Sequence, residues 1–316
     1  MQPSHPIVIL ALPRSYSSLT CAMLGQHPQL YDLLETQLFE VDTMQMWWQR
    51  YGKNDHDGDG LTRVVAEVVF GGQSPLAASL ARHWLRARRK WQTKEMFGFL
   101  LEALAPLTPV EKNPLEDATS VGVQQKLVRR RESVPEACFI HLTRHPVSYG
   151  LSHLKHLRTM GKSTDPVRML RRYQMMVDKN ERNPSVSVVD PQVLWYRVNA
   201  GILEFLETHP GVSYIRIRSE DLLSRPTVQL RRITRYLGIR DDERAIACMT
   251  HPERSPFACL GPRNARFGGD PAFFSSPAFR RKVPPSAPLD RPLPWRHDRG
   301  RFCPWVVELA GRLGYA

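Results

Sequence analysis

Short apolar runs alternate along this chain with longer segments that repeat apolar positions at helical spacing. Each run has the length and composition of a buried strand, and together they cover residues 7–12, 107–110, 138–143 and 212–217. Strands separated by helices are typical of a parallel sheet that is covered on both faces. The pattern therefore predicts an α/β fold, a doubly wound and mainly parallel sheet with helices on both faces. In such sheets ligands bind at the carboxyl ends of the strands.

The segment after the first strand predicts a turn that leads into a helix. It reads PRSYSS over residues 13–18, and the helix is predicted over about 18–26. A helix that begins directly after a strand offers free N–H groups and its positive dipole end to an anion. Against the P-loop pattern G-x-x-x-x-G-K-[ST], Ala11 and Tyr16 replace the glycines and Ser17 replaces the lysine, while Ser18 fits. Two interpretations stay open: an ordinary turn before a capped helix, or a loop for an anion other than a nucleoside triphosphate.

Polar residues also follow the other predicted strands. The second strand is followed by EKNP at 111–114, and the fourth by RSED at 218–221, with a helix predicted over 227–237. The third is followed by Arg144, and Ser152 lies eight residues further on, within the next predicted helix. This spacing puts a guanidinium and a hydroxyl on one side of the junction, where both could bind a second phosphate. A surface arginine is the alternative interpretation.

Composition indicates one domain with an anionic partner. The chain has 316 residues and 42% hydrophobic content, so we expect a single domain over 1–316 with a substantial core. Its net charge of +13 suits nucleic acid, a membrane surface, an acidic protein or a phosphorylated small molecule. The basic residues form short clusters at 86–90, 129–131 and 280–282, with no long basic tail. That distribution favours local anion sites over a polybasic arm.

Neither a metal site nor a disulfide framework is indicated. The five cysteines are widely spaced with no CxxC pair, and the polar turn DHDGDG at 55–60 lacks the closing glutamate of a calcium loop. We expect no metal. The N-terminus shows no signal-peptide pattern, and no run approaches the roughly 20 apolar residues of a membrane span. These features predict a cytoplasmic protein without a transmembrane segment, and its oligomeric state cannot be predicted from the sequence.

The ordered set of motifs resembles the sulfotransferase family that uses 3′-phosphoadenosine 5′-phosphosulfate (PAPS). PRSYSS is similar to the family's PRSGTT loop, EKNP to its EK(T/N)P or NKDP segment, and Arg144 with Ser152 to its Arg-(x7)-Ser unit. SEDLLSRPTVQLRRITRYLGI is similar to YEDLL…P…LGL, although Ser219 replaces the tyrosine. GPRNARFGGDPAFFSSPAFR resembles GGDPxFLxxPxLR of bacterial members. The resemblance runs from the first strand to the closing LAGRLGY and implies a P-loop-like fold.

The resemblance also implies roles for individual residues. The loop residues Arg14, Ser15, Tyr16, Ser17 and Ser18 would hold the 5′-phosphosulfate, with Arg14 also stabilising the leaving group. Arg144 and Ser152 would hold the 3′-phosphate. Lys112 would lie near the sulfonate. No Mg²⁺ is implied, because PAPS has no triphosphate to neutralise.

Glu35 is the implied general base. In the tyrosylprotein branch of the family a glutamate stands in a context like HPxxxxxEET, and this chain has HPQLYDLLET with Glu35 at the same distance from the loop arginine. A surface glutamate is the alternative from the residues alone. By their chemistry, five histidines compete with Glu35 for the role of base: His141, His145, His153, His156 and His251.

We therefore expect a PAPS-dependent sulfotransferase that acts on a hydroxyl of a small-molecule or carrier-bound acceptor. A small-molecule kinase on a degenerate P-loop and a basic nucleic-acid-binding protein are the alternatives. Residues 155–190 and 255–295 are predicted as lid-like insertions that contact the acceptor. Trp47, Trp48, Phe97 and Phe99 could line an apolar acceptor pocket or belong to the core. The acceptor itself is not encoded in any motif that we recognise.

Overall fold

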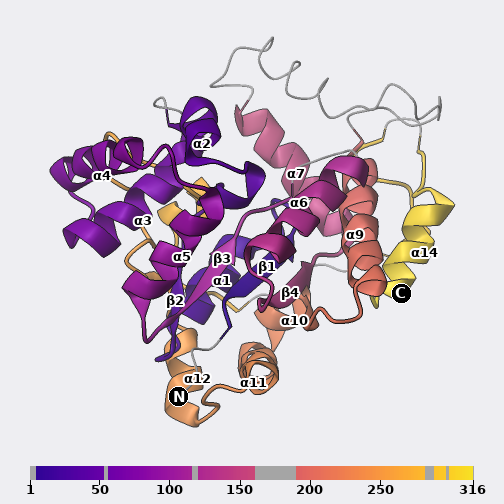
Figure 1. Cartoon of the computed structure of the whole chain (residues 1–316). Helices are drawn as coiled ribbons and strands as arrows, with labels where there is room; N and C mark the ends of the chain where they lie inside the picture. Colours follow the sequence, from indigo (N-terminus) through magenta and orange to yellow (C-terminus); the bar gives the residue numbers. More distant parts are fainter. Residues whose placement is uncertain are drawn as a thin grey trace.

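A five-stranded parallel sheet forms the centre of the computed structural model, which describes residues 5–52, 56–115, 120–160, 190–281, 288–296 and 299–315. The sheet order is β2-β3-β1-β4-β5, so the first strand lies in the middle (Figure 1). The strands are β1 (Ile7–Ala11), β2 (Leu30–Asp32), β3 (Thr108–Lys112), β4 (Cys138–Thr143) and β5 (Tyr214–Arg218). Because all neighbours pair in parallel, the carboxyl ends of the strands share one edge of the sheet.

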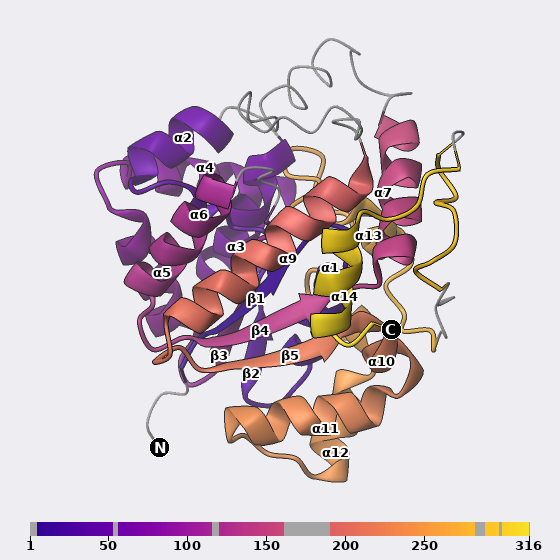
Figure 2. The same cartoon turned by 90° about the vertical axis from the view of Figure 1, so that its right-hand side faces the viewer.

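Helices cover both faces of this sheet, as the two views show (Figures 1 and 2). The α-helices are α1 (Ser17–Gly25), α2 (Met44–Tyr51), α3 (Asp59–Phe70), α4 (Pro75–Ala87), α5 (Thr93–Leu104), α6 (Ser120–Ser133), α7 (Pro146–Met160), α9 (Pro191–Thr208), α10 (Ser219–Ser224), α11 (Pro226–Leu237), α12 (Glu243–Met249), α13 (Pro271–Ser275) and α14 (Pro304–Arg312). Short 3-10 turns lie at η1 (Leu38–Glu40), η2 (His56–Gly58) and η3 (Pro252–Arg254).

The alternation of side chains along β1 divides the core into two layers. Ile7 and Ile9 point to one face, where they join apolar residues of α1, α11 and α12. Val8 and Leu10 point to the other face, beneath α5, α6 and α9. Both faces of β1 are fully buried, which explains its continuous apolar sequence. The predicted doubly wound α/β fold is confirmed.

The sequence pattern missed one strand and shortened another. β2 has only three residues and lies at the edge of the sheet, so it is too short to show a period. β3 continues past the predicted end at Val110 through Glu111 and Lys112, and all five of its residues are buried. Charged residues interrupt an apolar run, so a pattern of hydropathy cannot reveal a strand that buries them.

The first part of the second predicted lid, residues 259–267, lies along α3, where Arg63 binds it. This arginine is 0% exposed and donates to the carbonyls of Phe267 (3.0 Å) and Cys259 (2.9 Å) and to Gln73 Oε1 (2.6 Å). Asp59 accepts the N–H of Phe267 at 3.0 Å. A buried guanidinium with several carbonyl acceptors fixes the path of the chain it binds. Most of the first predicted lid, residues 161–189, lies outside the described residues.

No single helix among the described residues has the length and apolarity to cross a membrane. One bent helix pair, residues 56–70 with 75–87, meets those two criteria only when both parts are taken together.

Glu111 carries a fully buried carboxyl group on β3, next to the central strand β1. It pairs in register with Val8 on β1, and neither of its carboxyl oxygens has a hydrogen-bond partner in the described part of the chain. Burial raises its pKa to about 7, against the opposing charge of Arg130. Burial likewise raises the pKa of Asp32 to about 7, although Ser255 Oγ donates to it at 2.6 Å.

We expect the free energy of unfolding to fall as pH rises from about 4.5 towards 7. The folded protein keeps a proton on Glu111 over this range while the unfolded chain releases it, so the stabilisation is complete below the unfolded pKa and lost as pH rises through the folded one. A shift of this size corresponds to about 3 kcal/mol. Glu111→Gln removes the titration, so its effect on Tm is more favourable at pH 8 than at pH 5.5. An equal change in Tm at both pH values would contradict this assignment.

Candidate active site

The loop between β1 and α1 has an unusual backbone. Arg14 and Tyr16 both adopt left-handed conformations, with φ of 64° and 63°. Non-glycine residues rarely do so, and such strain persists only where surrounding contacts hold it. Tyr16 occupies the N-cap of α1 without a side-chain capping bond. The first N–H groups of α1 therefore have no side-chain cap and are available to a ligand.

Two polar groups of this loop are buried without a partner among the described residues. They are Nε of Arg14 and Oγ of Ser15, a residue that is 0% exposed. Buried donors of this kind are costly unless something accepts from them. Together with the helix N-terminus, they form a site whose chemistry fits an anion with several oxygens.

Arg144 holds the loop in its left-handed conformation. It extends from the end of β4, where its Nη1 group donates to the carbonyl oxygen of Arg14 and its Nε donates to Ser148 Oγ at 3.0 Å. Its guanidinium lies 4.5 Å from the centre of the Tyr16 ring, a cation–π contact. Burial lowers the pKa of Arg144. The Tyr16 side chain is thus directed to Arg144, and Ser152 lies one helical turn beyond Ser148 on α7.

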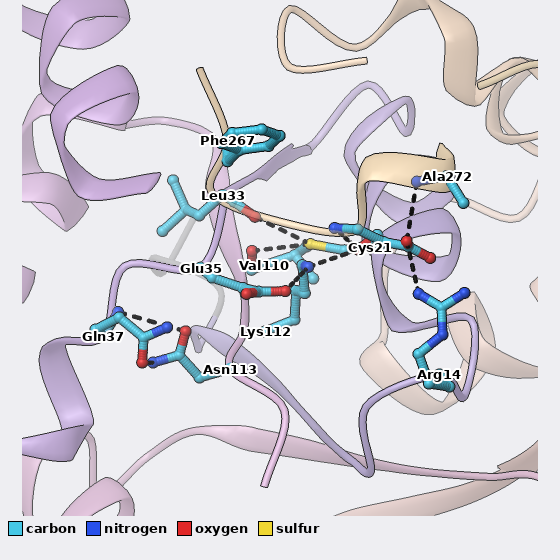
Figure 3. A network of polar contacts seen from close by, with 12 residues as sticks. Arg14, Cys21, Leu33, Glu35, Gln37, Val110, Lys112, Asn113, Phe267 and Ala272 are labelled. Carbon is cyan, nitrogen blue, oxygen red and sulfur yellow. Dashed lines mark hydrogen bonds and ion pairs between the residues drawn. The ribbon is translucent and has the colours of Figure 1, made fainter. Parts of the chain in front are cut away.

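Lys112 is the centre of the second cluster, at the end of β3. Its ammonium group is only 2% exposed and contacts Glu35 Oε1 at 2.5 Å and Ser18 Oγ at 2.6 Å (Figure 3). Three elements distant in sequence thus meet at the carboxyl edge of the sheet. A buried ammonium requires such partners, because its desolvation is otherwise costly.

The chain that follows Arg266 passes directly over this cluster. We call residues 267–275 the strap. Gly268 accepts the N–H of Glu35 at 2.9 Å, and Asp270 donates its own N–H to Ser18 Oγ at 3.2 Å. Gly268 has φ of 105°, and a Cβ there would lie 2.4 Å from Gly60 Cα, so only glycine fits. The strap therefore covers Glu35 and Ser18, the two partners of Lys112.

Asp270 links the strap to the loop. Its Oδ1 accepts from Arg14 Nη1 at 2.7 Å and from the N–H of Ala272 at 3.0 Å, which caps α13. The GGDP motif is visible in the sequence, but no role was predicted for Asp270. The available signal was the Asp-Pro pair, which is typical of a helix start.

The competing histidines differ from Glu35 in their surroundings. His141 is fully buried beside Asn199, and burial lowers its pKa to about 3. His153 stacks on Tyr149, and burial lowers its pKa to about 4 with help from the charges of His156 and Arg14. Groups with such low pKa values are weak bases. His251 is bound to Glu253 near the surface.

The remaining predicted residues lie mostly in the core. Trp47 is 0% exposed and donates to the carbonyl of Thr36, and Phe97 is 1% exposed. Ser219 is also fully buried, at the start of α10. Among the described residues, no group of three or more histidine, cysteine, aspartate or glutamate side chains is placed to hold a metal ion.

Comparison with known proteins identifies the family. A model described as "Sulfotransferase family" matches residues 6–243. Two solved structures are similar to this chain over 99% of its length. One is the sulfotransferase domain from the curacin biosynthetic pathway, with 22% identity, 98% of that chain covered and a TM-score of 0.69.

The other is the sulfotransferase domain from the Synechococcus PCC 7002 olefin synthase, with 23% identity, 96% of that chain covered and a TM-score of 0.66. No curated protein matches by sequence. At these identities the two structures support the fold, whereas the family match spans most of the chain. The protein therefore belongs to the sulfotransferase family, whose chemistry is the transfer of a sulfuryl group.

Proposed function

We propose that this enzyme transfers the sulfuryl group of PAPS to a hydroxyl of a small-molecule or carrier-bound acceptor, without a metal ion. The observation that carries the proposal is the pair of buried donors without acceptors in the loop, Arg14 Nε and Ser15 Oγ, next to the N-terminus of α1. They lie at the same sheet edge as Lys112. A phosphosulfate supplies several oxygens that such donors would bind.

The residues divide between the two ends of the nucleotide. Arg14 and the backbone N–H groups and hydroxyls of residues 15–18 would hold the 5′-phosphosulfate. Ser18 Oγ already accepts two hydrogen bonds, so its own proton is left to donate to the ligand. Arg144 and Ser152 would hold the 3′-phosphate. Arg144 uses Nε and Nη1 within the described protein, which leaves Nη2 for this contact.

The reaction follows from these positions. The acceptor oxygen attacks sulfur while the bond between sulfur and the bridging oxygen breaks, with the two oxygens in line. The hydroxyl proton passes to the Glu35 carboxylate. The negative charge that develops on the departing 5′-phosphate is stabilised by Arg14 and the helix N-terminus. The product is a sulfate ester together with 3′,5′-adenosine bisphosphate.

The Lys112–Glu35 pair couples donor binding to base formation. In the absence of donor the carboxylate of Glu35 is bound to the ammonium group. A sulfonate that attracts Lys112 weakens this contact and frees the Glu35 carboxylate to accept a hydrogen bond from the acceptor hydroxyl. The base therefore becomes available when the electrophile is in place.

The acceptor class rests on the similar structures. Both are domains of biosynthetic systems, the curacin pathway and an olefin synthase. We infer a biosynthetic hydroxyl acceptor, free or carried by a protein. The proposal also places the enzyme in the cytoplasm, where its free cysteines stay reduced.

The first prediction concerns the nucleotide. We expect 3′,5′-adenosine bisphosphate at millimolar concentration to raise Tm in the presence of EDTA, since a ligand that binds only the folded state stabilises it. Arg14→Ala reduces the shift, because it deletes the cation at the 5′-phosphate while the N-terminus of α1 and Arg144 remain. Arg144→Lys reduces it, because lysine lacks the planar fork of donors.

Arg235→Ala serves as the control for this experiment. Arg235 lies in the last turn of α11, pairs with Asp241 and is 69% exposed, so the shift should persist. Mg²⁺-dependent protection by ATP, with none from the bisphosphate, would instead favour the kinase.

The second prediction concerns the base. Glu35→Gln keeps a hydrogen-bond acceptor for Lys112 but cannot take a proton, so we expect turnover to fall about 10²- to 10⁴-fold with binding of the bisphosphate retained. Turnover is measured as release of the bisphosphate from PAPS in a metabolite extract, together with the gain of one SO₃ group in a product by mass spectrometry. Glu207→Gln, at an exposed pair with Arg312, makes the same charge change and should leave turnover unaltered. Full activity in Glu35→Gln would mean that another group accepts the hydroxyl proton.

A further inference from the structure

The two cations assigned to the phosphosulfate end of the candidate donor site are each paired with a carboxylate of the same chain. Lys112 is paired with Glu35, and Arg14 is paired with Asp270 at 2.7 Å. Glu35 has a role in the proposed chemistry, whereas Asp270 has none. Its carboxylate is 28% exposed and the Arg14 side chain 18%, so this ion pair is only partly screened by water.

The Asp270 carboxylate lies at the edge of the loop. The backbone N–H of the same residue donates to Ser18 Oγ, the hydroxyl that is assigned to the phosphosulfate. The Arg14 guanidinium and the N–H of Ala272, both labelled in Figure 3, donate to this carboxylate. A fixed negative charge therefore lies beside a site that is to receive an anion.

On the basis of the proposed function, we propose that Asp270 is an affinity-setting residue of the donor site. Its carboxylate is the counter-ion of Arg14 when no donor is bound, and an entering phosphosulfate competes with it for this arginine. Arg14 is a single cation between two anions, so each weakens the hold of the other. The competition lowers the affinity of this loop for any anion, so it disfavours small anions that make few other contacts, such as inorganic sulfate, and favours release of the bisphosphate product.

A purely structural role for Asp270 makes a different prediction. The residue caps α13, and aspartate and asparagine are equally good N-caps. Asp270→Asn keeps the cap and the backbone contact to Ser18, but it removes the charge. If Asp270 serves only as a cap, this substitution leaves ligand binding unaltered.

The test is the dissociation constant of 3′,5′-adenosine bisphosphate, measured by titration calorimetry. We expect Asp270→Asn to tighten binding about three- to tenfold, with a larger gain at low salt. Asp241→Asn makes the same change in net charge at the exposed pair with Arg235 and should leave binding unchanged. In an Arg14→Ala background the effect of Asp270→Asn should disappear, because the two residues act through one contact.

Unchanged or weaker binding in Asp270→Asn overturns the proposal. Asp270→Ser also supplies an N-cap without charge and replaces the first variant if that one does not fold. Inorganic pyrophosphate serves as a second probe. Its dissociation constant measures anion binding at the loop without a contribution from the adenosine. If the bisphosphate binds no variant but pyrophosphate binds more tightly to Asp270→Asn, the nucleotide assignment fails and the counter-ion role stands. If the unaltered protein and Asp270→Asn bind pyrophosphate equally well, the counter-ion role of Asp270 is overturned.

Discussion

The burial of one ammonium group organises the carboxyl edge of this sheet. Lys112 belongs to a strand whose residues are all inaccessible to solvent, and its charge must be satisfied by protein atoms. A carboxylate from the segment after β2 and a hydroxyl from α1 converge on it for that reason. The strap then covers both partners through backbone hydrogen bonds. Three chain segments thus take their positions from the need to pair one charge.

The loop beside this cluster depends on a second cation. Arg144 binds the carbonyl of Arg14 and the ring of Tyr16. These are the two residues of this loop that have a left-handed backbone. Where the related loops have glycine, this chain keeps a side chain and offsets part of the strain with a cation–π contact. Arg144 holds this loop and is also the proposed ligand of the 3′-phosphate. Binding at the 3′-phosphate would therefore affect the conformation of the loop that holds the 5′ end.

The sequence was sufficient to predict most of the sheet, because four of its strands are short apolar runs between helices. It could not predict β2, which has only three residues. It also missed the last two residues of β3, Glu111 and Lys112, because buried charges break the apolar pattern. Arg144 was a candidate because it directly follows a strand, and parallel strands bring such positions together. The roles of Arg14 and Lys112 came from the family resemblance. Glu35 came only from family resemblance, since it lies outside any regular element. Asp270 received no role, because nothing local in the sequence reports a contact with a residue 256 positions earlier.

That separation affects how the protein is made. Asp270 of the strap lies 256 positions after Arg14 of the loop whose site it completes, so the strap leaves the ribosome long after the loop. Synthesis proceeds from the N-terminus at about 5–20 residues per second, so all five strands are available before the strap is made. The sheet can therefore assemble while its anion site still lacks a cover and Arg14 still lacks its carboxylate. The complete site exists only once residues 267–275 have been made, so a product terminated before them would contain the sheet without the strap that covers the site.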